Sequence, residues 1–379
     1  MNPRQRVVSA LDRREPDRFP IDLGGTNVTS LEVDAYTNLR QYLGLQPDAS
    51  PEISHIQQGT VYPKADLLRH YGIDCRPVTM KRAPRWVAVE KRADGSWIDE
   101  YGILWRPSVH SYYDSVTCPL ADSTLADLEL VRWPDAYDPA RVEGLREQAR
   151  RLYEGTEYAV VADIMCRGPF EQACKLRGYE RFCLDLALDG RFAQALLAKI
   201  TDLILGLWDA YLAAVGDYVQ VVCQGDDLGT QTGLFISPQM YRRFIKPCHR
   251  RIFEFVHART PAKIFFHSCG SVYDILPDLI EAGVDVLNPV QYRAAKMDLA
   301  RLKREFGCHL SFWGGGIDTQ QVLPQASPQQ IEREVSSNVE TLAAGGGFVF
   351  ALTHNVQPDV SPDRLDLVYR TALKACGAS

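Results

Sequence analysis

The sequence contains no apolar run that approaches the roughly 20 residues of a membrane span, and its N-terminus lacks the apolar core of a signal peptide. Basic residues are not in excess either, because the net charge is −6 and the isoelectric point is about 5.8. Nucleic-acid and anionic-membrane surfaces both need clustered lysine and arginine, so we expect neither partner. These absences favour a cytoplasmic protein, and a homo-oligomer is compatible with them.

The ten cysteines form no Cys-x-x-Cys pair and no dense framework of the kind found in small secreted proteins. We therefore expect most of them to be reduced thiols packed in the core. A dinucleotide-binding fingerprint is also missing, because Gly314-Gly315-Gly316 lacks the required spacing and helix start. With 379 residues, 46% of them hydrophobic, the chain can bury one large core, and we expect a single domain over residues 1–379.

Short apolar segments alternate with helical patterns along the chain. The expected strands are 18–23, 158–164, 218–223, 264–266, 284–287, 310–313 and 348–352. The expected helices are 192–215, 238–258 after the cap Ser237, 272–282 and 327–343. Continuously apolar strands that alternate with helices predict an α/β protein whose parallel sheet is covered on both faces.

A closed (β/α)8 TIM barrel explains the polar strand ends better than an open sheet does. In a barrel all loops that follow the strands open onto one rim, whereas an open sheet divides them about a switch point. The barrel would gather nine polar residues on that rim: Asp22, Asp226, Asp227, His267, Cys269, Asn288, Gln291, Asp318 and His354.

One segment, from about residue 40 to residue 150, fits the barrel pattern poorly. It contains short alternating runs at 86–90 and 97–101, with Asp94-Gly95 between them as a hairpin turn. We interpret the segment as an elaboration between the first two barrel strands that covers part of the rim. Its aromatic residues have two open roles, as a wall for an aromatic substrate or as packing; they include Tyr62, Tyr101 and Trp105.

His267 and Cys269 follow the apolar strand 263–266 directly. Side chains two apart on a strand project from the same side, and imidazole and thiolate are ligands that zinc prefers. A catalytic zinc needs one more protein ligand and an open position, and His354, at the end of the last strand, would lie beside the first strand of a closed barrel. A buried thiol beside an ordinary hydrogen-bonded histidine is the alternative that the same spacing allows.

Several motifs along the chain belong together. They are Arg4-Gln5-Arg6-Val7, Asp17-Arg18-Phe19-Pro20, Asp226-Asp227-Leu228-Gly229, Ile236-Ser237-Pro238, His267-Ser268-Cys269-Gly270, Gly314-Gly315-Gly316-Ile317-Asp318, Gly345-Gly346-Gly347-Phe348 and His354-Asn355-Val356-Gln357-Pro358-Asp359. This set resembles the uroporphyrinogen decarboxylase superfamily. The resemblance implies a TIM barrel and one of two activities, because the superfamily joins true decarboxylases to zinc-dependent methyltransferases that work with corrinoid proteins.

The resemblance separates these two branches by residue type. True decarboxylases carry an Arg-Gln-Ala-Gly-Arg-Tyr segment whose arginines hold the carboxylates of the porphyrinogen, and the corresponding stretch here, 22–28, has no arginine. The methyltransferases carry a His-x-Cys pair, which His267 and Cys269 match, and complete the zinc site with a cysteine at the last strand end. His354 stands at that third position, where true decarboxylases also keep a histidine.

The third zinc ligand therefore has several candidates. Either His354 replaces the thiolate, or the ligand is Asp226, Asp227 or Glu171. We also assign catalytic roles to Asp226, Asp227 and His354, although rim solvation and capping of a helix start are open alternatives for the two aspartates. Substrate contacts are assigned to Asp22, Asn27, Gln231, Asn288, Gln291 and Asp318.

The function expected from this resemblance is transfer of a methyl group between a small methoxylated, methylamine or thiol compound and a corrinoid protein, with Zn²⁺ as a Lewis acid. One thiolate and two neutral imidazoles leave a net positive zinc, which favours demethylation of an ether or amine over methylation of a thiol. A metal-free decarboxylase that uses Asp22 or Asp226 with His354 is the alternative enzyme. A binding protein that has kept the barrel without catalysis is the alternative from another class.

Overall fold

The computed structural model describes residues 1–82, 92–108, 113–188 and 190–377. Its centre is a curled sheet of seven parallel strands, in which each strand pairs with the next one along the sheet. In sheet order they are β4 (Cys75–Val78), β8 (Ala159–Ala162), β9 (Val221–Gly225), β10 (Lys263–His267), β11 (Val286–Asn288), β12 (Ser311–Trp313) and β13 (Phe348–Val349). Six of these seven strands overlap the runs that the apolar pattern predicts.

The segment around Ile21 occupies the eighth position and closes the sheet. Ile21 forms a parallel bridge with Phe350 on the β13 side. On the β4 side, its carbonyl accepts a hydrogen bond of 2.9 Å from the backbone amide of Asp74, and its own amide donates to the Asp74 carboxylate at 2.8 Å. The (β/α)8 barrel predicted from the sequence is therefore confirmed, with a much shorter first strand than the predicted 18–23.

The second barrel strand is β4, which the apolar pattern did not predict. The run is short and contains Arg76 and Pro77, so it does not look like a buried strand. Arg76 is accommodated because its guanidinium lies 3.6 Å from the centre of the Tyr158 ring and donates to two backbone carbonyls. As a result 158–164, expected as the second strand, contains the third, and the elaborated segment lies on both sides of β4.

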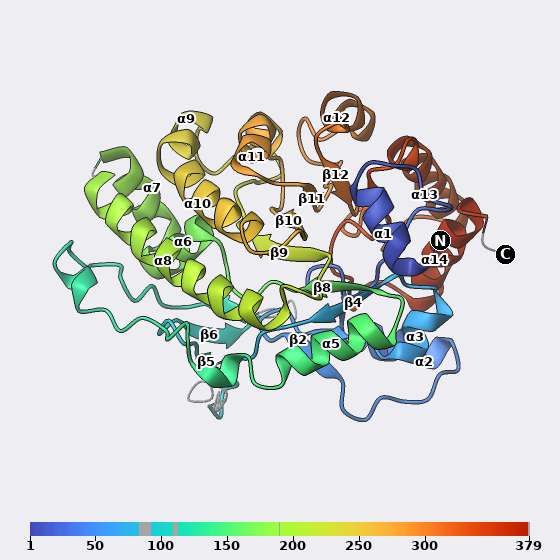
Figure 1. Ribbon diagram of the computed structural model, residues 1–379, viewed down its shortest axis with the longest axis horizontal. Helices are drawn as coiled ribbons and strands as arrows, with labels where there is room; N and C mark the ends of the chain where they lie inside the picture. Colours follow the sequence, from blue (N-terminus) through green and yellow to red (C-terminus); the bar gives the residue numbers. More distant parts are fainter. Residues whose placement is uncertain (83–91, 109–112, 189, 378–379) are drawn as a thin grey trace.

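Helices surround the sheet, and α10 to α13 form an arc outside the strands in Figure 1. The helices are α1 (Pro3–Leu11), α2 (Val33–Tyr42), α3 (Ala65–His70), α5 (Leu145–Gly155), α6 (Pro169–Arg177), α7 (Tyr179–Leu188), α8 (Gly190–Val215), α9 (Pro238–Met240), α10 (Lys246–His257), α11 (Leu276–Ala282), α12 (Leu299–Phe306), α13 (Pro328–Ala343) and α14 (Pro362–Ala375). The expected helix 238–258 is divided by a π-helical segment, Tyr241–Ile245. Among the helices described, none combines the length and apolarity that a membrane crossing requires.

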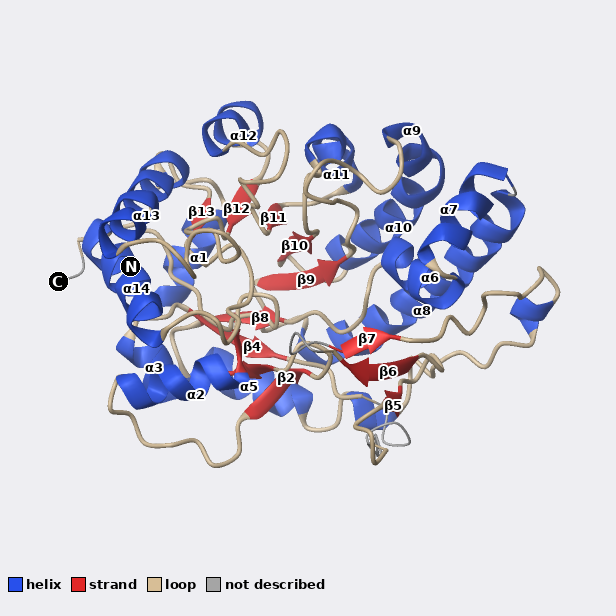
Figure 2. Cartoon of the chain, turned by 180° about the vertical axis from the view of Figure 1, so that it is seen from behind, coloured by secondary structure: helices blue, strands red, loops and turns tan. Residues whose placement is uncertain are grey.

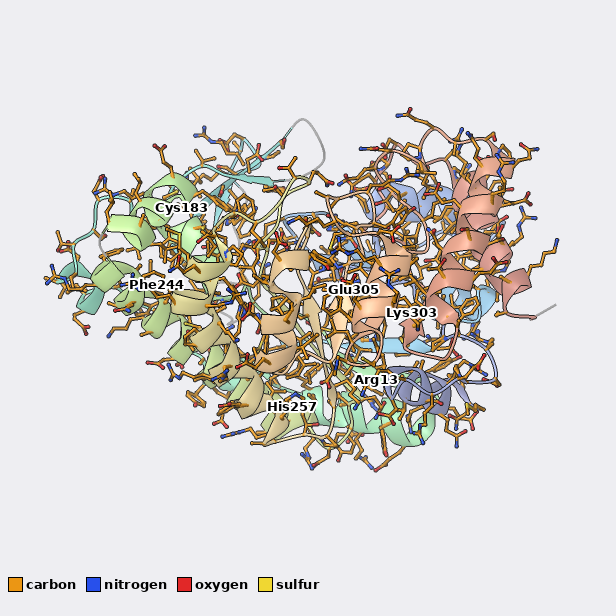
Figure 3. All side chains as sticks on the ribbon, turned by 90° about the horizontal axis from the view of Figure 1, so that it is seen from above. Arg13, Cys183, Phe244, His257, Lys303 and Glu305 are labelled. Carbon is orange, nitrogen blue, oxygen red and sulfur yellow. The ribbon has the colours of Figure 1, made fainter. Side chains whose placement is uncertain are left out.

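The core has two layers because side chains alternate along each strand. Phe265, Val286 and Trp313 belong to the cluster that fills the barrel, and Val7 and Leu11 of α1 join it. The residues in between pack outward in a second cluster that includes the helices. Contacts between helices complete this outer layer; for example, the Lys303 ammonium on α12, labelled in Figure 3, donates to the carbonyl of Leu342 on α13 at 2.8 Å. Every cysteine is free, as expected.

Two small antiparallel sheets lie beside the barrel strands, as Figure 2 shows. One has the order β1 (Leu31–Glu32), β3 (Thr60–Tyr62), β2 (Glu52–His55), and the other the order β5 (Trp97–Ile98), β6 (Leu104–Pro107), β7 (Tyr113–Ser115). Trp97 pairs with Trp105 of β6, and the amide of Arg92 donates to the carbonyl of Ser96 at 2.8 Å around the expected turn at Asp94-Gly95. The other strand of the expected hairpin, 86–90, lies outside the described residues. The amide of Tyr113 donates to the carbonyl of Gln57 at 2.8 Å, which joins the two sheets.

Candidate metal centre

Three potential metal ligands meet at the C-terminal ends of the barrel strands. One ligand atom each from His267, Cys269 and His354 lies within 4.8 Å of the others. The Nε2 atom of His267 is 3.4 Å from the Cys269 Sγ, and the two histidine rings are 5.7 Å apart between their centres. This is the only such group of three or more His, Cys, Asp or Glu side chains in the described part of the chain, and the sequence predicts all three members.

The pleat of β10 places His267 in the site. Phe265 points into the barrel, so the side chain two residues later points inward one layer higher. Across the sheet, His267 pairs with Gly225 of β9 on one side and with Asn288 of β11 on the other. Because Gly225 has no side chain, the space beside the imidazole on the β9 side stays open.

Asn288 fixes the orientation and the tautomer of His267. Its Nδ2 donates to the carbonyl of Trp313 at 2.8 Å, so its Oδ1 must face the imidazole, where it lies 2.6 Å from the His267 Nδ1. An amide oxygen only accepts, so the proton is assigned to Nδ1. Nε2 then carries a lone pair directed at the Cys269 side. Metal-binding histidines characteristically have such an outer partner.

The loop that carries Cys269 is held by hydrogen bonds on several sides. The amide of Cys269 donates to the Asp227 carboxylate at 2.8 Å, and the amide of Gly270 donates to the side-chain oxygen of Gln291. Gly270 has a φ of +79°, and a Cβ atom there would lie 2.5 Å from the carbonyl oxygen of Thr230. Only glycine fits this close approach, which holds the thiol at a defined position.

The electrostatic environment suits a cation. Burial, reinforced by the nearby Asp227 and Glu171 carboxylates, raises the pKa of the Cys269 thiol well above its ordinary value. Burial, together with the neighbouring His267, lowers the pKa of His354 to about 4, so its imidazole is neutral at pH 7. The imidazole of His354 has no hydrogen-bond partner among the described residues. Two neutral imidazoles and a thiol that needs a positive neighbour to ionise are the donor set of zinc, so these residues fit the metal.

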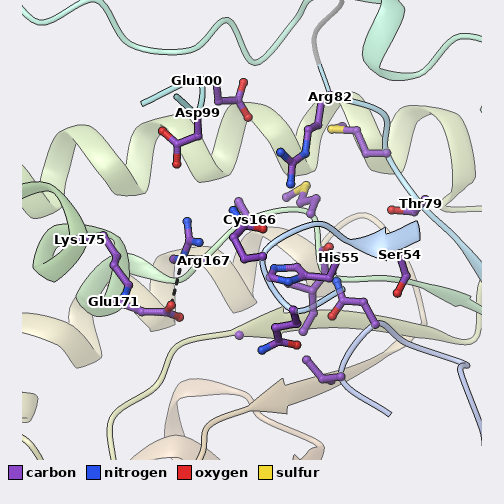
Figure 4. A pocket seen from close by; sticks show the side chains of 18 of the residues that line it. Ser54, His55, Thr79, Arg82, Asp99, Glu100, Cys166, Arg167, Glu171 and Lys175 are labelled. Atoms are coloured by element: carbon purple, nitrogen blue, oxygen red, sulfur yellow. Dashed lines mark hydrogen bonds and ion pairs between the residues drawn. The ribbon is translucent and has the colours of Figure 1, made fainter. Parts of the chain in front are cut away.

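A cavity of about 310 Å³ opens beside this group. His267, Asp227 and Gly225 contribute the barrel side of its wall, and Asn27, one of the predicted substrate contacts, also lines it. The opposite side is formed by the elaborated segment, including residues 54–58, 79–82 and 99–101. Figure 4 shows this cavity, with the ion pair between Arg167 and Glu171 (3.0 Å) drawn as a dashed line.

The two adjacent aspartates after β9 have different positions. Asp226 is fully buried, and its carboxylate accepts from the amides of Phe170 and Glu171 at 3.0 and 2.7 Å and contacts the His249 Nε2 at 2.8 Å. It therefore caps the start of α6, the alternative role left open above, and does not line the cavity. Asp227 does line it, and one of its oxygens lies 3.9 Å from the His267 Nε2.

The other predicted residues divide into two groups. Asp22 is buried beneath the site, where it accepts hydrogen bonds from Thr29, Gly25 and Trp313. Asn288 and Gln291 are also buried, and their side chains form hydrogen bonds within the protein. Gln231 is exposed and contacts Gln320, and Asp318 caps the backbone of residues 320–322. Neither of these two lines the cavity. Tyr62, Tyr101 and Trp105 differ in role as well, because Tyr62 donates to a carboxylate whereas Tyr101 and Trp105 face the cavity.

Several polar residues in and around the cavity were not predicted from the sequence. Asp163 follows β8 and accepts from Tyr62 at 2.5 Å and from the amide of Asn27 at 2.8 Å, and its burial raises its pKa to about 7. It stands at a strand end, a signal that could have identified it. His55, Arg82 and Arg167 line the cavity itself, but no periodicity marks them because they lie in loops and in a cover strand.

Comparison with known proteins places the chain in a family. The model of the uroporphyrinogen decarboxylase family matches residues 113–374, more than half of the chain. A methylated-thiol–coenzyme M methyltransferase of Methanosarcina mazei is 24% identical over 221 residues, 56% of this chain and 54% of the relative. A uroporphyrinogen decarboxylase of Xanthomonas campestris is 27% identical over 187 residues, 46% of this chain and 47% of the relative.

The chain thus spans about half the length of the curated relatives it matches. Among solved structures, a methyltransferase from Methanosarcina mazei superposes over 99% of both chains with a TM-score of 0.66 and 16% sequence identity, a similarity that concerns the fold. The extent of the family match, together with the barrel, leads to one conclusion. The chain belongs to the uroporphyrinogen decarboxylase family.

Proposed function

We propose that this protein is a zinc-dependent methyltransferase that moves a methyl group between a small methylated compound and a corrinoid protein. The observation that carries the proposal is the group of His267, Cys269 and His354, with ligand atoms within 4.8 Å and the Nε2 lone pair of His267 directed into the site. The same pair of histidine and cysteine holds zinc in the methyltransferase branch that the sequence resembles. Similarity to a Methanosarcina methyltransferase supports the same activity.

A zinc ion held by these three residues would act as a Lewis acid on the heteroatom that carries the methyl group. Asn288 keeps the His267 ring oriented, and the loop bonds of Asp227 and Gln291 keep the Cys269 thiol in place. One thiolate and two neutral imidazoles leave the centre with a net positive charge. Such a centre stabilises an alkoxide, phenoxide or amine leaving group, so we favour demethylation of an ether or an amine over methylation of a thiol.

Decarboxylation of a porphyrinogen is less compatible with the structure. The stretch 22–28 supplies no arginine for substrate carboxylates. The cavity beside the metal centre, about 310 Å³, suits a compound of one ring better than four linked pyrroles with eight carboxylates. The corrinoid, which is also too large for this cavity, would approach from the open rim on its carrier protein.

Zinc content is the first test. Protein purified without chelator should contain one zinc per chain by plasma mass spectrometry, and His267→Ala and Cys269→Ala should each lose it. Cys308→Ser is the matched control, because Cys308 is an exposed free thiol and its replacement should leave zinc unchanged. The wild-type protein without stoichiometric zinc would overturn the proposal.

Two further experiments refine the proposal. His354→Ala should weaken zinc binding at least about 10-fold if the imidazole is the third ligand. Unchanged binding in that variant with loss in Asp227→Asn would assign the third position to Asp227. An assay with methoxylated aromatics, methylamines and methylthiols and a reduced corrinoid protein should give methyl transfer from an ether or amine. Transfer with thiols alone would contradict the argument from the charge of the centre.

A further inference from the structure

Arg82 places an unpaired guanidinium in the cavity beside the metal centre. Arg82 follows β4, is partly buried and lines the cavity, and its guanidinium carbon lies 5.6 Å from the centre of the Trp97 ring. No carboxylate of the described residues forms an ion pair with it. The other two arginines of the cavity are paired, Arg167 with Glu171 at 3.0 Å and Arg141 with Glu100. Among the described residues, Arg82 therefore differs from these two arginines in having no ion pair, although the charges of Glu100 and Asp99 act on it from a distance.

An unpaired charge in this position has a free-energy cost. Burial lowers the pKa of Arg82, yet a guanidinium stays protonated at any physiological pH. A desolvated charge without a partner destabilises the folded protein unless a ligand supplies the opposite charge. Among the described residues that line the cavity, five side chains are cationic and four carry a carboxyl group, and burial raises the pKa of one of these, Glu171, to about 7, so at least one positive charge remains when the histidines are neutral. The cavity is thus matched to a ligand with a single negative charge.

Polar groups next to Arg82 also lack partners. The Nδ1 atom of His55 and the Oε1 atom of Gln57 are both buried without a hydrogen bond, and both residues line the cavity. The Gln57 side chain belongs to a residue that is only 7% exposed. In Figure 4 the Arg82 guanidinium points toward Cys166 and His55. The Arg82 guanidinium and the His55 imidazole therefore lie in one part of the cavity, and Gln57 contributes to the wall of the same cavity.

This part of the cavity communicates with the metal centre. Arg82, His55 and His267 line the same cavity. Burial, followed by the charges of Arg167, Arg82 and His267, lowers the pKa of His55 to about 3. Tyr101 and Trp105 line the same cavity. Aromatic walls of this kind favour a flat ligand body. One ligand can thus extend from Arg82 to the metal centre.

We propose that the substrate is a small aromatic carboxylate, with its carboxylate on Arg82 and its methyl-bearing heteroatom at the metal centre. A planar guanidinium pairs with a carboxylate through two parallel hydrogen bonds. The four acidic side chains of the wall disfavour a dianion such as phosphate. The orientation of the substrate rests on the proposed methyltransferase function, whereas carboxylate binding at Arg82 does not require it.

Calorimetric binding of two matched probes, 4-methoxybenzoate and neutral 4-methoxybenzamide, tests this site. Wild-type protein should prefer the carboxylate by at least about 10-fold, because a charge-assisted bidentate pair contributes that much or more. Arg82→Gln should abolish the preference while the affinity for the amide stays the same, and Arg82→Lys should keep part of it. Arg106→Gln removes an exposed arginine of β6 and serves as the control with the preference intact.

Thermal unfolding provides a second readout. Without ligand, Arg82→Gln should unfold at a higher temperature than wild type, because it removes an uncompensated charge. A lack of carboxylate preference in wild type, or an undiminished preference in Arg82→Gln, would overturn the proposal. Tighter binding of methyl phosphate would overturn the carboxylate assignment, and equal binding of methoxyacetate would overturn the aromatic part.

The same titrations on zinc-free protein separate this proposal from the metal function. Carboxylate preference that depends on Arg82 should persist without zinc. A preference that disappears with zinc and survives in Arg82→Gln would assign the carboxylate to the metal and overturn the Arg82 site. Absence of zinc with an intact Arg82-dependent preference would instead contradict the proposed methyltransferase and leave the anion site in place.

Discussion

The hydrogen bond between Asn288 and His267 gives the metal centre a sharp test. Asn288→Ala removes the acceptor of the Nδ1 proton, which lies 2.6 Å away, so the imidazole can adopt the other tautomer and rotate. Loss of such an outer partner typically weakens metal binding by roughly 10- to 100-fold. That range corresponds to about 1.4 to 2.8 kcal/mol.

The variant also affects folding, and that effect must be separated from metal affinity. The Asn288 side chain is buried and donates to the Trp313 carbonyl at 2.8 Å, so its loss leaves a buried acceptor unpaired and costs about 1 to 3 kcal/mol. Asn338→Ala is the matched control. Asn338 is also buried and donates to the carbonyls of Gly315 and Gly316, but it has no contact with the ligands.

Zinc affinity should be measured by competition with a chromophoric chelator at pH 7.5, and stability by thermal unfolding of the same samples. We expect both variants to be destabilised and only Asn288→Ala to bind zinc more weakly. Wild-type zinc affinity in folded Asn288→Ala would refute the assignment of the tautomer. Equal weakening in Asn338→Ala would show that general destabilisation, and not the outer hydrogen bond, controls the affinity.

Three further outcomes follow from particular contacts. Gly270→Ala should cost about 1 to 3 kcal/mol of stability and weaken zinc binding, because a Cβ would meet the Thr230 carbonyl at 2.5 Å. Gly233→Ala on the neighbouring loop is the control, because a Cβ there meets no atom within 4 Å. The control variant should match wild type in chelator competition and in thermal unfolding. Asp227→Asn should lower kcat with little change in Tm. Asp226→Asn should lower Tm because it weakens the cap of α6. The reverse pattern would contradict the positions of the two carboxylates. Burial raises the pKa of Asp163 from 3.8 to about 7, so the folded protein holds this proton more tightly than the unfolded chain, and the stabilisation that it gives at low pH is lost as the pH rises through about 7. The stability of Asp163→Asn relative to wild type, followed by thermal unfolding, should therefore rise between pH 5 and pH 8 by up to roughly 3 kcal/mol, and a constant difference would contradict the shifted pKa.

The close approach of His267, Cys269 and His354 could be predicted from the sequence because it depends mainly on local geometry. His267 and Cys269 share a face through the two-residue period of a strand, and that relation does not depend on the rest of the fold. His354 required only the additional assumption that the barrel closes. Both predictions rest on the positions of strands and strand ends, which the pattern of apolar residues indicates.

The substrate cavity could not be predicted in the same way. Its wall joins Arg82 after β4, His55 of β2 and Glu171 of α6, which are distant along the chain and meet only through tertiary packing. Strand β4 was not predicted either, because Arg76 and Pro77 are unusual residues in a buried strand. Polar side chains such as Asn288 and Asp226 were predicted to belong to the site. Whether each faces the cavity or the protein interior depends on its hydrogen-bond partners, and the sequence does not show which residues these are.

The charges of the two halves of the site have one consequence for substrate choice. Zinc held by one thiolate and two neutral imidazoles would be cationic, and Arg82 adds a second positive group that forms no ion pair with a carboxylate of the described residues. A carboxylate at Arg82 would offset the charge of the guanidinium without binding the metal. The metal would then remain available to coordinate the oxygen of an ether or the nitrogen of an amine. A neutral methyl ether would lack the first interaction and a dianion would also meet the acidic wall. The arrangement therefore selects a monoanion with its methyl group at the opposite end, and discrimination between charged and neutral ethers should be seen in KM more than in kcat, because the carboxylate contact is present before and during methyl transfer.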